Sequence, residues 1–313
     1  MKKVEMEKSK TASAATEYAK AEVHLHEIED ASIALRVFGQ GPALVFIHGY
    51  PVSGYTWRKL IPALATKFTC YVIDLPGLGN SRWQTNTDFS FTAQAHRLDK
   101  LFKKLNLNDF TIIAHDTGAT IARLVALLQP EKVNKLVMFN TEIPDHRPPW
   151  VQFYQVLASA PLAHLMFRMC MSSSLFIRSP MGLGQFYSKP ELFQTPGYIG
   201  PYIDPLVNNS HRLKGALGYL KGIEWKVVDD LRERHKEIPA EVLFLWGEED
   251  TTFPVHLAEE MCEQFRSKPI FVRLASASLM PHEEQPDAIL EHLLPFLLNK
   301  NQTTEAVDVA EAI

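Results

Sequence analysis

The stretch Ala114-His115-Asp116-Thr117-Gly118 places a carboxylate where one pattern of apolar residues gives way to another. Residues 111–114 form a short apolar run typical of a buried strand, and residues 119–129 carry apolar side chains at helical spacing. Small residues two positions before and after Asp116 favour a tight strand–turn–helix corner, like the G-x-S-x-G elbow with aspartate in place of serine. A carboxylate at such a corner can attack saturated carbon and form an ester. We expect helix N–H groups to keep it ionised.

Aspartate is also a favoured helix N-cap, so a purely structural role for Asp116 is the alternative. A second motif bears on the choice: His48-Gly49-Tyr50-Pro51 follows the apolar residues 43–47. On its own it fits an ordinary Gly/Pro turn. If it meets the elbow instead, the backbone N–H groups of Tyr50 and Thr117 form an oxyanion hole beside Asp116.

Acidic residues follow two later apolar runs. Asp250 ends the loop after residues 242–245, and we expect it to be the acid that orients a base. Glu248 and Glu249, in the same loop, fit a solvated surface. Glu142 is the stronger rival because it also lies just past a predicted strand.

His282 lies in the sequence Met-Pro-His-Glu-Glu-Gln-Pro, between the last predicted strand and the last predicted helix. A lone loop histidine is usually a solvated surface residue. Here it completes the chain order nucleophile, acid, histidine, which makes it the candidate general base. The sequence therefore predicts a catalytic triad of Asp116, Asp250 and His282.

Composition narrows the class of protein. The 313 residues are 46% hydrophobic and 10% aromatic, and the net charge of -4 gives no signature for binding nucleic acid. The three cysteines are far apart and form neither a disulfide framework nor a metal-ligand spacing, so we expect a reducing, cytoplasmic location. No stretch reaches the roughly 18 apolar residues of a membrane span, and we expect no membrane partner.

Apolar runs alternate with helical patterns along most of the chain, which indicates an α/β fold with a mostly parallel sheet and helices on both faces. Residues 23–27 and 33–38 instead alternate like an antiparallel pair at a sheet edge. The remaining predicted strands are residues 43–47, 69–73, 111–114, 135–139, 242–245 and 270–274, and the predicted helices are residues 57–65, 93–105, 119–129, 256–265 and 287–298.

The alternation stops after residue 141 and resumes at residue 242, and the intervening chain is rich in Met, Phe, Leu, Tyr and Pro. We expect a core of residues 23–143 and 236–298, with a helical cap of residues 144–235 over the open end of the sheet. Residues 1–22 and 299–313 are expected to be flexible tails.

Taken together, these motifs resemble the α/β-hydrolase-fold family that contains soluble epoxide hydrolases and haloalkane dehalogenases. The resemblance covers roughly residues 23–298 and rests on residues 48–51, 115–119 and 246–250 and on His282. It implies a two-step hydrolysis in which Asp116 forms an ester and His282 activates water to cleave it. It implies no metal or organic cofactor, and its partners are a small hydrophobic substrate and water.

The leaving group decides the substrate class. Epoxide hydrolases use cap tyrosines, and Tyr154 and Tyr219 resemble these; Trp150 is a third candidate contact, and packing within the cap is the alternative for each tyrosine. Haloalkane dehalogenases typically place Trp, and fluoroacetate dehalogenases Arg, where this chain has Thr117. Epoxide hydrolysis is therefore the predicted activity. The alternatives are a haloalkane or haloacid dehalogenase with Trp150 or Trp225 as halide donor, and a non-catalytic ligand-binding relative.

Overall fold

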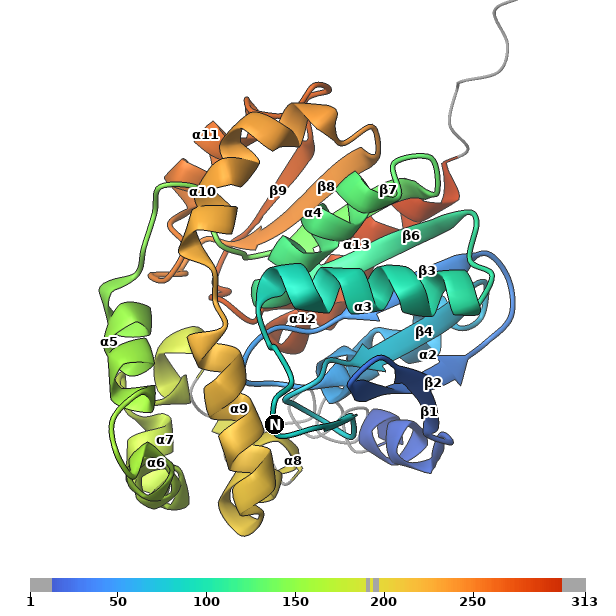
Figure 1. The fold of residues 1–313 in the computed structure, drawn as a ribbon. Coiled ribbons are helices and arrows are strands. Elements are labelled where there is room, and N and C mark those ends of the chain that lie inside the picture. The colour runs from blue at the N-terminus through green and yellow to red at the C-terminus, as the bar shows by residue number, and fades with distance from the viewer. Residues whose placement is uncertain (1–12, 190–191, 194–196, 300–313) are drawn as a thin grey trace, which may run out of the picture.

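The structure is a computed structural model of the chain, and it describes residues 13–189, 192–193 and 197–299. Its centre is one nine-stranded sheet in the order β1-β2-β4-β3-β6-β7-β8-β9, with β5 paired to β2 (Figure 1). The strands are β1 (His24–Ile28), β2 (Ala31–Phe38), β3 (Ala43–Ile47), β4 (Thr69–Asp74), β5 (Arg82–Trp83), β6 (Phe110–His115), β7 (Val133–Phe139), β8 (Glu241–Gly247) and β9 (Ile270–Leu274).

Strand direction follows the predicted patterns. The alternating strands β1 and β2 pair antiparallel, and β2 joins β4 antiparallel as well. From β4 onward every neighbouring pair is parallel. The carboxyl ends of β3, β6, β7 and β8 therefore meet at one edge, where ligands bind in open α/β sheets.

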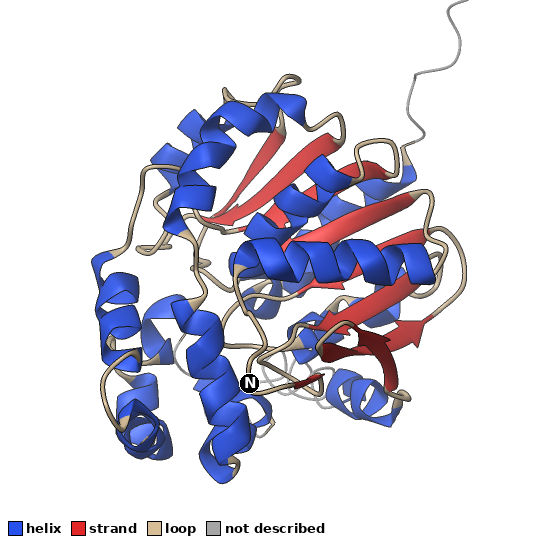
Figure 2. Cartoon of the chain, viewed as in Figure 1, coloured by secondary structure: helices blue, strands red, loops and turns tan. Residues whose placement is uncertain are grey.

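Side chains of the central strands alternate between two cores. Val45 and Ile47 of β3 pack into one apolar cluster, and Leu44 and Phe46 pack into the other. Helices cover both faces of the sheet (Figure 2). The first cluster includes α3 (Phe91–Lys104), α4 (Thr117–Leu128) and α11 (Val255–Cys262); the second includes η1 (Gly54–Lys59), α2 (Ile61–Leu64) and α13 (Pro286–Leu298).

The described chain between β7 and β8 contains helices but no strand, and Figure 1 shows most of these helices grouped beside one end of the sheet. They are α5 (Pro149–Ala158), α6 (Ala163–Ser172), α7 (Ser174–Arg178), η2 (Leu183–Phe186), α8 (Gly200–Asn208), α9 (Ser210–Lys221), α10 (Trp225–Arg234) and η4 (His235–Glu237). We call residues 144–235 the cap.

The predicted N-terminal tail is wrong in part. Residues 13–20 form a helix, and Tyr18 is buried with its ring 5.7 Å from Phe38 and 5.5 Å from Tyr55. Burial of this aromatic side chain holds the segment on the core. Residues 1–12 and 300–313 lie outside the described residues.

Candidate active site

Asp116 lies at the corner between β6 and α4, with φ of 52° and ψ of −134°. Residues with a Cβ rarely adopt this backbone conformation. The corner is also tight: a Cβ on Gly49 would lie 2.4 Å from Asp116 Cβ, and one on Gly118 would lie 2.3 Å from the His48 carbonyl oxygen. Asp116 holds the N-cap position of α4, yet its side chain makes no capping hydrogen bond. Helix capping therefore does not account for this aspartate.

Two backbone N–H groups contact the Asp116 carboxylate. The Tyr50 N–H donates to Oδ2 at 2.8 Å, and the Thr117 N–H lies close enough to lower the pKa of the carboxyl. This is the arrangement that the predicted oxyanion hole requires, because one of these oxygens becomes the oxyanion when the ester is attacked.

Burial and a neighbouring acid both act on Asp116. Burial raises its pKa well above the ordinary value, and the nearby Glu142 raises it further, while the N–H groups of Tyr50 and Thr117 lower it by less. The N–H groups therefore act in the expected direction, toward the ionised form, and burial opposes them.

A cavity of about 120 Å³ lies between the core and the cap, and Asp116 and Glu142 are the two acidic residues in its lining. It compares with the engineered apolar cavity of about 150 Å³ in another protein that binds benzene, so it has room for one small molecule. Much of the lining is apolar or aromatic and comes from the cap, namely Trp150, Val151, Tyr154, Phe167, Met171, Phe176, Ile177 and Met181.

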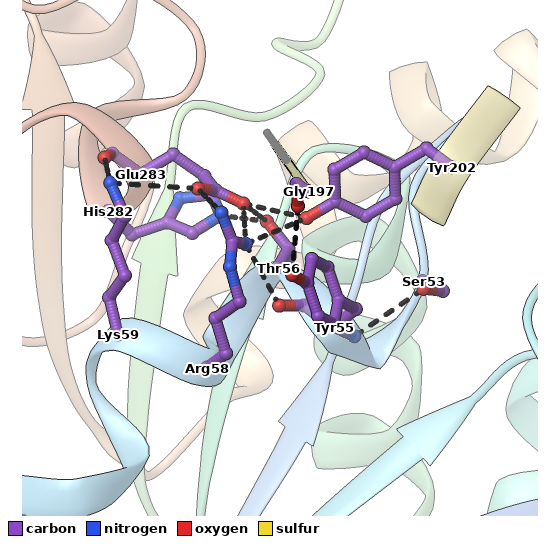
Figure 3. Close-up of polar contacts among 9 residues, drawn as sticks. All are labelled: Ser53, Tyr55, Thr56, Arg58, Lys59, Gly197, Tyr202, His282 and Glu283. Carbon is purple, nitrogen blue, oxygen red and sulfur yellow. Dashed lines mark hydrogen bonds and ion pairs between the residues drawn. The ribbon is translucent and has the colours of Figure 1, made fainter. Parts of the chain in front are cut away.

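His282 lies on α12 (Pro281–Glu284) and does not line this cavity, which corrects its assignment as the base. Its ring is buried, with centroids 4.6 Å from both Trp57 and His115. Nε2 forms a hydrogen bond with Thr56 Oγ1 (Figure 3), with 2.6 Å between the two atoms, and Nδ1 has no hydrogen-bond partner within the described part of the chain. Neither ring nitrogen therefore contacts Asp116 or Asp250. Burial, followed by the neighbouring His115, lowers the pKa of His282 well below its ordinary value, so the ring is neutral.

The next residue, Glu283, explains this orientation. Its Oε1 and Oε2 accept hydrogen bonds from Arg58 at 2.5 and 2.8 Å, and both side chains are fully buried. Tyr202 of the cap also donates to Oε1 at 2.6 Å (Figure 3). Successive side chains of a helix point about 100° apart. The hydrogen bonds of Glu283 to Arg58 therefore fix the orientation of α12, and in that orientation His282 points toward Thr56.

Leu279 is the residue of the loop after β9 that lines the cavity, and sequence analysis missed it. An apolar side chain therefore faces Asp116 from the loop in which a base was expected. Asp250, the predicted acid, is buried and accepts hydrogen bonds from Asn140 Nδ2 at 2.8 Å and from the Thr252 N–H at 2.7 Å. Burial raises its pKa to about 7. The predicted triad is thus not assembled: Asp250 is bonded to neutral donors rather than to an imidazole.

Glu142 is the other acidic residue in the cavity lining. Its Oε2 accepts hydrogen bonds from Thr120 Oγ1 at 2.6 Å and Thr141 Oγ1 at 3.1 Å, and Thr141 Oγ1 also lies 2.9 Å from the Asp116 carbonyl oxygen. Burial raises the pKa of Glu142, while hydrogen bonds from Thr120 and from its own backbone N–H, with the charge of Arg123, lower it by less. A carboxylate with a raised pKa can accept a proton.

The predicted cap contacts divide into two groups. Trp150 and Tyr154 line the cavity, whereas Tyr219 does not. Tyr219 donates to Thr117 Oγ1 at 3.1 Å, and the Tyr154 hydroxyl donates to the Met181 carbonyl. Trp225 Nε1 donates to Gln155 at 2.8 Å. By contrast, Trp150 Nε1 is buried without a partner in the described structure, so it is the indole donor left for a ligand.

A mostly parallel sheet, a helical cap and an acid on a strand–helix elbow define a hydrolase of the α/β type. Residues 42–278 match the model of the alpha/beta hydrolase fold. The chain belongs to this family, and both the predicted fold and the predicted family are confirmed.

Individual relatives differ in activity. The chain is 24% identical over 275 residues to pimeloyl-[acyl-carrier protein] methyl ester esterase of Aeromonas hydrophila, covering 84% of this chain and 99% of the esterase. It is 23% identical over 294 residues to human epoxide hydrolase 4, covering 86% of this chain and 77% of that enzyme. The solved structure of the epoxide hydrolase CorEH superposes with a TM-score of 0.72 at 20% identity, over 89% of this chain and 99% of CorEH.

Proposed function

We propose that this α/β hydrolase opens a small hydrophobic epoxide, with Asp116 as the attacking carboxylate and Glu142 as the base of the second step. The observation that carries the proposal is the position of Asp116: it lines an apolar cavity beside the N–H groups of Tyr50 and Thr117, and the Tyr50 N–H donates a hydrogen bond to its Oδ2. These N–H groups leave the carboxylate able to attack carbon and are suited to stabilise the tetrahedral intermediate that follows.

In the first step, an Asp116 oxygen attacks a ring carbon, the carbon–oxygen bond of the epoxide breaks, and an ester and an alkoxide form. The alkoxide needs a donor. The hydroxyls of Tyr154 and Tyr219 already donate hydrogen bonds to other protein groups. The donors that remain are the Trp150 N–H and the Tyr50 hydroxyl, for which no hydrogen bond is seen among the described residues. Tyr50 gives the proton and Trp150 donates a hydrogen bond to the oxygen.

In the second step, Glu142 takes a proton from water as the water oxygen bonds to the ester carbonyl carbon. The tetrahedral intermediate collapses, and the alkyl oxygen leaves with the proton from Glu142, which makes it the second hydroxyl of a diol. The carboxyl proton of Asp116 then passes to the Tyr50 phenolate, so that all three groups return to their starting states. Base assistance of this kind contributes on the order of 10²–10⁴ in rate. Glu142 takes this role because His282 is outside the cavity.

The test is product formation by purified protein from small aryl and alkyl epoxides, with Asp116→Asn as the matched variant. We expect more than one diol per protein molecule from the natural chain and none from the variant. Equal turnover by both would overturn Asp116 as the attacking group.

A dehalogenase is the second candidate, favoured by one observation. The unpartnered N–H of Trp150 in an apolar cavity suits a departing halide as well as an alkoxide. Chloroalkanes of matching size, assayed for halide release beside the epoxides, decide between the two substrate classes.

A non-catalytic binding role is the third candidate, because no imidazole reaches Asp116 or Asp250. In that case, substrates would be bound, or held as an ester on Asp116, without diol or halide being released repeatedly. Intact-mass spectrometry of the incubated protein measures the ester directly.

A further inference from the structure

The outer face of the first three cap helices exposes an unusual set of apolar side chains. The described residues carry twelve large hydrophobic side chains that are exposed, and eight of them lie between residues 153 and 181. Val156, Met169 and Leu175 are exposed by 71%, 76% and 82%. Figure 1 shows α5, α6 and α7 together at one edge of the molecule, away from β1 and β2. We call this surface the α5–α7 face. Apolar area of this kind marks an interaction site.

All of the Asp, Glu, Lys and Arg residues in the same segment are basic. The whole chain has a net charge of -4, yet residues 146–190 contain no Asp or Glu and include Arg147, Arg168, Arg178 and Lys189. Arg147 pairs with Asp229. Arg168 and Arg178 are exposed, and neither guanidinium has an ion-pair or hydrogen-bond partner in the described ranges. The α5–α7 face is therefore apolar and purely cationic.

The cavity lies on the inner side of these helices. Phe167 of α6 and Phe176 of α7 line it, and Met181 both lines it and is 59% exposed. Met181 therefore reaches from the cavity wall to the protein surface beside the α5–α7 face.

We propose that the α5–α7 face docks onto the surface of an anionic lipid bilayer. Exposed Leu, Met, Val and Phe side chains insert among the acyl chains near the headgroups, and Arg168 and Arg178 bind lipid phosphates and carboxylates. The proposal is independent of the reaction at Asp116, and it replaces the expectation that no membrane takes part. No helix within the described ranges is long and apolar enough to span a bilayer, so the contact is peripheral.

Charge complementarity favours a bilayer over a second copy of the chain. A two-fold contact through this face would bring the arginines of both copies together with no carboxylate from residues 146–190 to neutralise them. An anionic surface supplies both the apolar phase and the negative charge.

Vesicle flotation with the full chain tests the proposal. We expect binding to phosphatidylcholine vesicles containing about 30% phosphatidylserine, with loss of binding in high salt and little binding to pure phosphatidylcholine. Arg168→Gln with Arg178→Gln should weaken binding about 25-fold, since each arginine contributes about fivefold. Met169→Glu with Leu175→Glu should abolish it.

Ile270→Glu is the matched control, because Ile270 is 55% exposed on β9, outside the cap, and should leave vesicle binding unchanged. Unchanged melting temperatures show that the variants are folded. Undiminished binding by the Met169/Leu175 double variant overturns the proposal, as does no binding by the natural chain. A lipid-free dimer in light scattering that both double variants dissociate, with no vesicle binding, would assign the face to a second copy instead.

Discussion

Thr56 Oγ1 lies 2.6 Å from Nε2 of His282, in the interior of the core rather than in the cavity. The imidazole that the chain order predicts to be the base thus contacts a core hydroxyl, and its ring packs at a tilt against Trp57. The histidine belongs to a structural cluster with Arg58 and Glu283, and the two carboxylates proposed to react line the cavity instead.

His282→Gln should therefore leave turnover within about threefold of the natural protein, whereas loss of a true general base costs on the order of 10²–10⁴. The Gln amide can still hydrogen bond to Thr56, which preserves the core. Steady-state diol formation measures this, and Asp116→Asn serves as the inactive control. Build-up of an Asp116 ester in the Gln variant would restore His282 as the base.

Glu142→Gln should block the second step and spare the first. Gln has nearly the same shape but cannot take a proton from water, so the ester on Asp116 should accumulate while its hydrolysis slows at least about 100-fold. Rapid-quench mass spectrometry follows both steps. Ester formation and decay at the natural rates would exclude Glu142 from the reaction.

Leu279→His should speed ester hydrolysis, because it puts an imidazole in the lining of the cavity that Asp116 also lines. We expect the ester to decay at least about tenfold faster. Leu279→Asn, polar but not basic, is the control, and equal decay in both variants contradicts the prediction.

The first step should become faster as pH rises. Attack requires ionised Asp116, and burial followed by the charge of Glu142 raises the pKa of this group. The rate of ester formation should increase about tenfold per pH unit below that pKa and level off above it. In Glu142→Gln one of the causes of the raised pKa is gone, so the midpoint should move to lower pH. A single-turnover pH profile of both proteins checks the direction; a flat profile, or a shift to higher pH, would contradict it.

Much of the fold could be predicted from local patterns. The apolar run at residues 43–47 matches β3, because a strand buried on both faces has no polar interruptions. The position of Asp116 at a strand–helix corner could be predicted because a corner this tight requires small residues next to it in the sequence. Glu142 was recognised as a residue at a strand end, and strand ends meet at one edge.

The orientation of His282 could not be predicted in this way. It depends on the pairing of Glu283 with Arg58, which lies 225 residues earlier in the chain. Leu279 and His282 lie less than one helical turn apart in the chain. The sequence carries no local signal of which of the two side chains faces the cavity. The partners of the Tyr154 and Tyr219 hydroxyls, Met181 and Thr117, likewise depend on cap packing, which has no local signal in the sequence.

The left-handed backbone at Asp116 has one more consequence. Glycine adopts that conformation without the Cβ penalty, so Asp116→Gly should be more stable than Asp116→Ala by about 1–3 kcal/mol in urea unfolding, although both lack the reactive group. The proposed nucleophile would then lower the stability of the protein, and selection for thermostability alone would tend to replace it.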